Sequence, residues 1–436
     1  MTVQTQYEVS TFKGQGSVVV EDGKAKLMAH SEEFRREVIK VAEGVYVGVG
    51  YAGSNSTLIE GDEGVIIVDT LEGIEAAEGL KKEFDSITDK PVKAIIYTHF
   101  HGDHTGGASV FAGDCNPEIV ANGSLTSFKV RSPVGKILGK RGMFQFGHDL
   151  PDSERLNYGI GPAKRPRGGL GQGWMAPTLT FTEERYRLTV AGVELDLVKS
   201  PGETEDHIYV WVPEKKLLLC GDNYYKAFPN IAPIRGSPYR DVVKWADSLD
   251  RIIAEGAECL IPGHTRPIFG ANEVRRVLSS YRDAIRYVYD KTVEGMNGGL
   301  TPDELVGYVK LPTHLAEEPS LQEYYGTVDW TVRSIFAGLA GWFDGNPTSL
   351  FPLPPSEYAE KIASLVGGVD VLRQKLRESF DRGEFQWVLH LADILLALER
   401  SSEVEGLKGE AMRELGERQI NATARNYLLT ASRKAR

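Results

Sequence analysis

Short apolar runs separated by glycine-rich turns fill the chain up to about residue 270. Examples are "GVYVGVGYAG", "NSTLIEG" and "GVIIVDT", which follow one another closely and predict successive strands of one sheet. Beyond residue 271 the apolar residues recur at helical spacing instead. We therefore predict an α/β domain over residues 1–270, followed by an all-α helical domain over residues 271–436.

Capping residues mark helix boundaries in the second half of the chain. In "TPDELVGYV", Thr301 and Glu304 form a capping box with a proline at the first helical position. In "SEYAEKIASLVGG", Ser356 is placed to cap the start of a helix and Gly367 to end it. Residues 380–418 predict a helical hairpin with an apolar face. We expect this helical domain to serve oligomerisation, substrate binding or both.

Three histidines and an aspartate crowd into "THFHGDH", directly after a predicted buried strand over residues 92–97. If the chain stays extended there, His99 and His101 project on the same side, because side chains alternate along a strand. The following glycine allows a turn that can bring Asp103 and His104 round to the same cavity. Imidazole and carboxylate ligands without thiolate suit Zn²⁺, with Fe or Mn possible.

The stretch "THFHGDH" resembles the HxHxDH signature of the metallo-β-lactamase superfamily. The resemblance implies an αββα sandwich with a dinuclear site along one edge and further ligands downstream. Three downstream residues stand at predicted strand ends, in "PGETEDHIYVWVP", "KKLLLCGDNYY" and "AECLIPGHTRP". The predicted sets for two Zn²⁺ ions per chain are His99, His101 and His207 on one metal, Asp103, His104 and His264 on the other, and Asp222 between them.

Three other residues near these motifs have alternative interpretations. Asp69 closes the strand "GVIIVD", and the resemblance implies that it supports the ligands by hydrogen bonding and does not bind a metal itself. Cys220 lies within an apolar run, so we interpret it as a small buried hydrophobe and not as a ligand. His148 belongs to a long irregular segment of the kind that is usually functional. We interpret His148 itself as a loop-packing residue.

Two further segments resemble the alkylsulfatase branch of the superfamily, including its helical dimerisation domain. They are "NIAPIRGSPYRD" and "EYYGTVDWTVRSIFAGLAGWFDGNPTSLFPLPP", and the resemblance extends over roughly residues 30–430. It implies that the sulfate group is held by Asn230, Arg235 and Tyr324 or Tyr325. His314, in "LPTHLAEE", is a candidate for protonating or binding the leaving group, and an exposed loop histidine is an equally good interpretation.

The chain departs from the alkylsulfatase pattern in two places. Alkylsulfatases present glutamates where this sequence has His207 and Asp222, which is closer to the wider hydrolase superfamily. They also commonly continue into a sterol-carrier-like domain, whereas this chain ends at "NYLLTASRKAR". Both departures weaken the assignment of a long-chain apolar substrate more than the assignment of hydrolysis.

The predicted chemistry is hydrolysis by a metal-activated hydroxide, because two neighbouring cations lower the pKa of a bridging water. Asp103 and Asp222 can orient that hydroxide, and Arg235 can offer its planar fork of donors to a sulfate. The leading hypothesis is cleavage of alkyl sulfate esters to alcohol and sulfate. Alternatives are hydrolysis of a carboxylic ester, lactone, thioester or β-lactam, and a metal-stabilised binding protein without turnover. A purely structural metal needs only four ligands, which disfavours the last.

The composition of the chain predicts its binding partners and its location in the cell. The net charge of −11 argues against nucleic-acid binding, which depends on a basic surface. Three cysteines without a CxxC pair, a start without a leader pattern and the lack of a long apolar stretch predict a cytoplasmic protein without membrane insertion. We expect a homodimer that acts on a small anionic ester.

Overall fold

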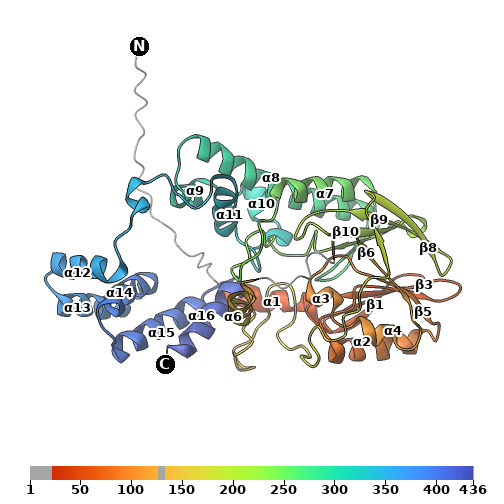
Figure 1. Ribbon diagram of the computed structural model, residues 1–436, viewed down its shortest axis with the longest axis horizontal. Helices are drawn as coiled ribbons and strands as arrows, with labels where there is room; N and C mark the ends of the chain where they lie inside the picture. The colour runs from red at the N-terminus through yellow and green to blue at the C-terminus, as the bar shows by residue number, and fades with distance from the viewer. Residues whose placement is uncertain (1–21, 126–132, 436) are drawn as a thin grey trace, which may run out of the picture.

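The computed structural model describes residues 22–125 and 133–435. Two mixed β-sheets lie face to face between helices, and further helices follow along the chain (Figure 1). This is the predicted αββα sandwich with a helical region after it. The first residues of the chain, on which the leader prediction rests, lie outside the described residues.

The first sheet has seven strands in chain order. They are β1 (Glu37–Ala42), β2 (Val45–Val49), β3 (Ser56–Glu60), β4 (Val65–Val68), β5 (Val92–Ile96), β6 (Glu118–Asn122) and β7 (Leu179–Phe181). Neighbours are antiparallel from β1 to β4 and parallel from β4 to β7. Strand β5 confirms the strand predicted before the histidine motif. Helices α2 (Ile74–Ile87) and α4 (Ala108–Ala112) cover the outer face of this sheet.

The second sheet has six strands in the order β13-β12-β11-β10-β9-β8. They are β8 (Arg185–Val190), β9 (Val193–Lys199), β10 (Ile208–Val212), β11 (Leu217–Gly221), β12 (Cys259–Pro262) and β13 (Ile268–Phe269). Only β11 and β12 run parallel to each other. The apolar faces of the two sheets bury residues such as Ile66, Val210 and Leu219 in one shared core. Burial of these β-branched and leucine side chains is what joins the sheets.

Helices α7 (Val242–Ala254) and α8 (Ala271–Asn297) cover the outer face of the second sheet (Figure 1). They are joined there by α9 (Pro302–Tyr308), α10 (Thr313–Ala316) and α11 (Val328–Ala340). Trp245, Tyr281 and Ile335 share one core with Leu260 of the sheet. The first helices after residue 271 therefore complete the layer over the sandwich, and the domain boundary at residue 270 stays a prediction.

The last five helices bury a separate apolar core that includes Leu391 and Leu415. They are α12 (Pro355–Val366), α13 (Val369–Asp381), α14 (Phe385–Leu398), α15 (Ser402–Glu417) and α16 (Ala422–Lys434). Helices α14 and α15 confirm the predicted hairpin. In Figure 1 helices α12–α14 lie at the end of the molecule farthest from the sheets.

Helix ends test the capping predictions. Thr301 and Glu304 form the predicted capping box at α9. Helix α12 ends at Gly367 as predicted, where φ is 100°, a backbone conformation that favours glycine. Its predicted start is wrong, because Pro354 and not Ser356 is the N-cap residue. Proline presets φ for the first turn, so the helix begins earlier than the serine suggests.

The remaining helical segments are short. They are α1 (Gly23–His30), α3 (Gly102–Thr105), α6 (Gly135–Gln145) and the 3-10 turns Ser31–Phe34, Pro213–Lys215, Pro319–Leu321 and Pro347–Leu350. Among the described residues, no helix is both long and apolar enough to cross a membrane.

Candidate metal centre

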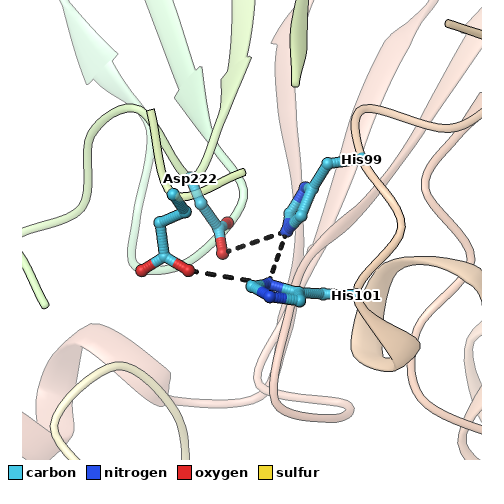
Figure 2. Close-up of side chains that lie close together, drawn as sticks. His99, His101 and Asp222 are labelled. Carbon is cyan, nitrogen blue, oxygen red and sulfur yellow. Dashed lines mark hydrogen bonds and ion pairs between the residues drawn. The ribbon is translucent and has the colours of Figure 1, made fainter. Parts of the chain in front are cut away.

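The predicted ligands meet at one edge of the sandwich, where strands from both sheets end. Strand β5 leads directly to His99 and His101, and β11 and β12 lead to Asp222 and His264. Figure 2 shows His99 and His101 reaching from the side of the first sheet toward Asp222, which comes from the second sheet. The interface between the two sheets thus brings together residues that are far apart in sequence.

One group of possible ligands contains His99, His101, Glu203 and Asp222. His99 Nε2 lies 2.9 Å from His101 Nδ1 and 3.6 Å from Asp222 Oδ2. Glu203 Oε2 lies 3.5 Å from His101 Nδ1. All four offer a nitrogen or oxygen atom to the same small space, which is the donor set that suits zinc or a similar divalent cation.

The second group contains Asp103, His104 and His264. His264 Nε2 lies 3.6 Å from Asp103 Oδ2, and His104 Nε2 lies 3.8 Å from the same oxygen. Asp222 reaches this group as well, because its oxygens lie 3.3 Å from Nε2 of His104 and of His264. Asp222 therefore stands between the two groups, as predicted from its place at the end of β11.

Hydrogen bonds on the far side of the rings fix how three histidines face the centre. Nδ1 of His104 lies 2.7 Å from Asp69 Oδ2, and Nδ1 of His264 lies 2.7 Å from the Gly53 carbonyl oxygen. Nδ1 of His99 lies 3.0 Å from Thr98 Oγ1. When Nδ1 is engaged in this way, Nε2 is left as the atom that can bind a cation.

Several inward-facing atoms have no hydrogen-bond partner within the described part of the chain. They are His104 Nε2, His264 Nε2 and Asp222 Oδ1, all buried, and each nitrogen has an Asp222 oxygen as a close polar neighbour, at 3.3 Å. An unpartnered buried polar atom is costly, and three of them facing one point is unusual in a folded protein. A bound cation would satisfy all three, so the residues present fit a metal.

Two glycines let the backbone approach the cluster closely. At Gly221, where φ is +51°, a Cβ atom would lie 2.6 Å from His207 Nε2. At Gly263 a Cβ atom would lie 2.5 Å from Asp222 Oδ1. Both are closer than real Cβ atoms come to other atoms, so a side chain at either position would displace the residues of the centre.

The structure differs from the predicted ligand set at His207. Its Nε2 accepts a hydrogen bond of 2.9 Å from the Asp222 backbone amide, and its Nδ1 lies 3.2 Å from Ser200 Oγ. Both ring nitrogens are therefore engaged within the protein, and burial lowers the pKa of His207 to about 3. Glu203, four residues earlier, lies beside the first histidine pair, so the chain does present a glutamate there.

Burial and charge set opposite protonation preferences within the centre. Burial lowers the pKa of His99 well below its ordinary value, which favours the neutral ring that binds metals. Burial acts the same way on His104, but the carboxylates of Asp222 and Asp69 outweigh it and raise the pKa of His104 well above its ordinary value. A cation in this position would compete with that proton.

A cavity of about 320 Å³ opens onto the cluster. Arg235 and Tyr325, both predicted to hold the sulfate, line it together with His101, Asp103, Asp222 and His264. The other predicted substrate residues are elsewhere. Asn230 is buried and engaged through its backbone with Tyr225 and Arg240, and Tyr324 stacks on His30 at 3.9 Å between ring centroids. His314 is exposed on α10 and is not among the lining residues.

The long irregular segment forms one wall of this cavity and contributes residues that the sequence did not single out. Arg165 Nη1 lies 3.2 Å from Glu72 Oε2, and its guanidinium lies 4.4 Å from the Tyr158 ring centroid. His148 also lines the cavity, where burial and nearby arginines lower its pKa to about 4. His148 is therefore neutral at neutral pH.

A second, more apolar cavity of about 680 Å³ joins the first. The two share His101, Glu203 and Arg235 as lining residues. Val134, Leu138, Pro238 and Tyr239 supply the apolar wall of the second cavity. A ligand with a charged head and an apolar tail could therefore place its head at Arg235 and its tail along this wall.

The sandwich and the His/Asp cluster at its edge define a protein of the metallo-β-lactamase fold. A family model described as "Metallo-beta-lactamase superfamily" matches residues 49–264, and one described as "Alkyl sulfatase dimerisation" matches residues 301–436. A linear primary-alkylsulfatase of Pseudomonas sp. is 37% identical over 86% of this chain and 72% of its own length. The chain belongs to the alkylsulfatase family.

Two further relatives extend the comparison. An alkyl/aryl-sulfatase of Saccharomyces cerevisiae is 30% identical over 92% of this chain and 64% of its own length. The solved structure of the stereoselective inverting sec-alkylsulfatase Pisa1 from Pseudomonas sp. superimposes with a TM-score of 0.87 at 27% identity, covering 96% of this chain and 68% of that one. The predicted family and fold are both confirmed.

Proposed function

We propose that this chain hydrolyses alkyl sulfate esters to an alcohol and sulfate, using two divalent metal ions. The observation that carries the proposal is the joined pair of cavities, in which Arg235 stands where a polar, His/Asp-lined chamber meets an apolar one. An alkyl sulfate has the same division into an anionic head and an apolar tail.

His99, His101, Glu203 and Asp222 would hold one ion, and Asp103, His104 and His264 the other, with Asp222 between them. Bound cations would supply Lewis-acid charge at the sulfate oxygens and acidify water for attack. Zn²⁺ suits these ligands, and Fe or Mn ions are alternatives. Attack on sulfur and attack on carbon are both compatible with this arrangement.

The chain's own residues would bind and orient the substrate. The Arg235 guanidinium offers a planar fork of donors that fits sulfate oxygens, and Tyr325 lines the same chamber. Arg165, held by Glu72 and Tyr158, adds a second, partly buried positive charge to the wall. Asp103 and Asp222 are placed to orient an attacking water. His314 is exposed on α10 and does not line the chamber, so a role in protonating the leaving group stays a prediction.

The experiment that tests this function is hydrolysis of four substrates in parallel: an alkyl sulfate, a carboxylic ester, a lactone and a β-lactam. We expect turnover of the alkyl sulfate to exceed that of the others at equal concentration. The apolar cavity supports this preference, because a charged head alone would not need it. Faster cleavage of the lactone, ester or β-lactam would favour the wider hydrolase alternative.

We also propose that the chain is a homodimer. The region matched by the dimerisation model carries large exposed apolar side chains, among them Trp342, Phe351 and Leu365, which are 77%, 91% and 82% exposed. Apolar exposure of this extent is typical of an interface. Light scattering should give twice the chain mass of 48.1 kDa at micromolar concentration, and a monomer mass would contradict the proposal. The cytoplasmic location stays a prediction from the cysteine pattern.

A further inference from the structure

A buried arginine lies directly behind Glu203. Arg240 Nη1 lies 2.8 Å from Glu203 Oε1, and the side chains of the two residues are 3% and 4% exposed. The Tyr225 hydroxyl donates to the same oxygen at 2.9 Å. One oxygen of the carboxylate is thus held by a charged donor and a neutral donor, both within the protein interior.

The other oxygen of Glu203 faces the metal centre. Oε2 lies 3.5 Å from His101 Nδ1, on the side where the first group of ligands converges. A carboxylate that binds a metal through one oxygen is commonly oriented through the other by a hydrogen bond from the protein. The two contacts on Oε1 therefore determine which way Oε2 points.

We infer that Arg240 is a positioning residue that sets the cation affinity of the first ligand group through Glu203. The inference rests on the proposed function, because it takes Glu203 as a ligand. A carboxylate buried this deeply is costly without a charged partner, and the Arg240 ion pair provides one before any cation binds. Glu203 is then held with Oε2 facing the first group of ligands, in the orientation that a cation requires.

Arg235 and Arg240 lie five residues apart in "RGSPYR" and differ in their surroundings. Arg235 lines both cavities, where a substrate could reach it, whereas Arg240 lines the apolar cavity alone and its side chain is 3% exposed. Arg240 Nη1 also donates a hydrogen bond of 2.6 Å to the Asn230 carbonyl oxygen. Arg240 therefore connects the loop over residues 230–240 with Glu203. A role limited to holding this segment is the competing explanation.

Whether metal affinity rises or falls when the Arg240 charge is removed shows whether the arginine acts by repelling the cation or by positioning Glu203. The positive charge of Arg240 repels a nearby cation, so if repulsion dominated, removing the charge would strengthen metal binding. If positioning dominates, removing it frees the Glu203 carboxylate to turn away from the ligand group and weakens metal binding. Loss of a partner that orients a ligand typically weakens metal affinity by about 10- to 100-fold.

The experiment is a zinc titration of the full-length protein against a chromophoric chelator, with bound metal counted by elemental analysis. We expect two equivalents in the wild type, and in Arg240→Met a fall of about 10- to 100-fold in the affinity of one equivalent only. Tyr225→Phe, which removes the neutral donor from the same oxygen, should give a smaller fall. Arg240→Lys, which retains the charge, should recover part of the affinity and replaces Arg240→Met if that variant does not fold.

Three outcomes would overturn the inference. They are unchanged affinity in Arg240→Met, tighter binding in that variant, and equal weakening of both equivalents, which would indicate a general structural role. A wild-type protein that takes up no cation would instead overturn the proposed function itself. Failure of the inference and failure of the proposed function therefore give different results.

Discussion

Asp69 Oδ2 lies 2.7 Å from Nδ1 of His104 and orients that ring toward the centre of the metal cluster. The same carboxylate accepts hydrogen bonds of 2.8 Å from the backbone amide and from the hydroxyl of Thr98, the residue before the histidine motif. Asp69 itself has a positive φ of 57°, a conformation that aspartate and asparagine tolerate better than most residues. One residue with positive φ, directly after β4, thus orients a histidine of α3, the short helix that follows the next strand.

Replacing Asp69 by asparagine should weaken metal binding while the fold is retained. Asparagine tolerates the same backbone conformation but brings no charge to His104, so the ring loses its charged partner. We expect metal affinity to fall by about 10- to 100-fold, measured by competition with a chelator. Unchanged affinity in a folded Asp69→Asn protein would mean that the contact does not orient the ligand.

Removing Asp222 should disturb both metal positions at once, because its oxygens lie within 3.6 Å of His99, His104 and His264. We expect Asp222→Ala to bind fewer than two metal ions per chain and to lose activity, with an unchanged circular dichroism spectrum. Asp370→Ala, at a carboxylate that is 96% exposed on α13, is the matched control and should bind as much metal as the wild type. Full metal content in Asp222→Ala would contradict its place between the ions.

Removal of the Arg235 guanidinium should discriminate between substrates. Losing a charged partner for the sulfate in a desolvated site should cost about 2 to 4 kcal/mol of transition-state stabilisation. This corresponds to a fall of roughly 30- to 1000-fold in kcat/KM. In Arg235→Ala the fall should be seen with a sulfate ester and be far smaller with a carboxylic ester of the same alcohol. Equal losses on both esters, with metal content unchanged, would point to a structural role for Arg235.

The stability of the protein should fall in acid because of His30. Its ring is buried against Tyr324 and lies 2.8 Å from the Gly159 carbonyl oxygen, and burial lowers its pKa to about 4 from an ordinary value of 6.5. Between these two values the unfolded chain takes up a proton that the folded protein does not. The free energy of unfolding should therefore decrease as the pH falls through that window, by up to about 3 kcal/mol from this residue.

Chemical denaturation at pH 7 and pH 4.5 measures this effect. His30→Gln can still donate to the Gly159 carbonyl but has no ring to protonate, so it should lose less stability between the two pH values than the wild type. The exposed His314 provides the control, and His314→Gln should keep the wild-type difference. If His30→Gln loses as much stability in acid as the wild type, His30 does not contribute to the acid sensitivity.

The sequence predicted most of the cluster because each predicted ligand lies next to a short apolar strand, whereas the sandwich was implied by the resemblance to the metallo-β-lactamase superfamily. His99, His101, Asp222 and His264 all obey that rule, and the structure brings all four to one edge. Glu203 obeys it too: it follows "PG" after β9, as His264 follows "PG" in "IPGH". The same turn-rich stretch ends at His207, where the next apolar run begins, and the pattern alone does not separate the two residues.

Other parts of the site had no local signal. Arg165 and Tyr158 belong to an irregular segment, and packing against distant parts of the chain such as Glu72 brings them to the cavity. Arg240 acts through contacts with residues from other turns of the chain, which spacing alone does not reveal. Long-range packing also decides that α8 joins the sandwich core although it lies beyond the predicted domain boundary.

The most direct test of the central claim is the release of sulfate from a linear alkyl sulfate by the purified protein, measured together with its metal content. We predict about two divalent ions per chain, equal amounts of alcohol and sulfate released, loss of turnover after treatment with a chelator, and recovery when Zn²⁺ is added back. Absence of sulfate release from the metal-loaded protein, or full release in the presence of the chelator, would contradict the account.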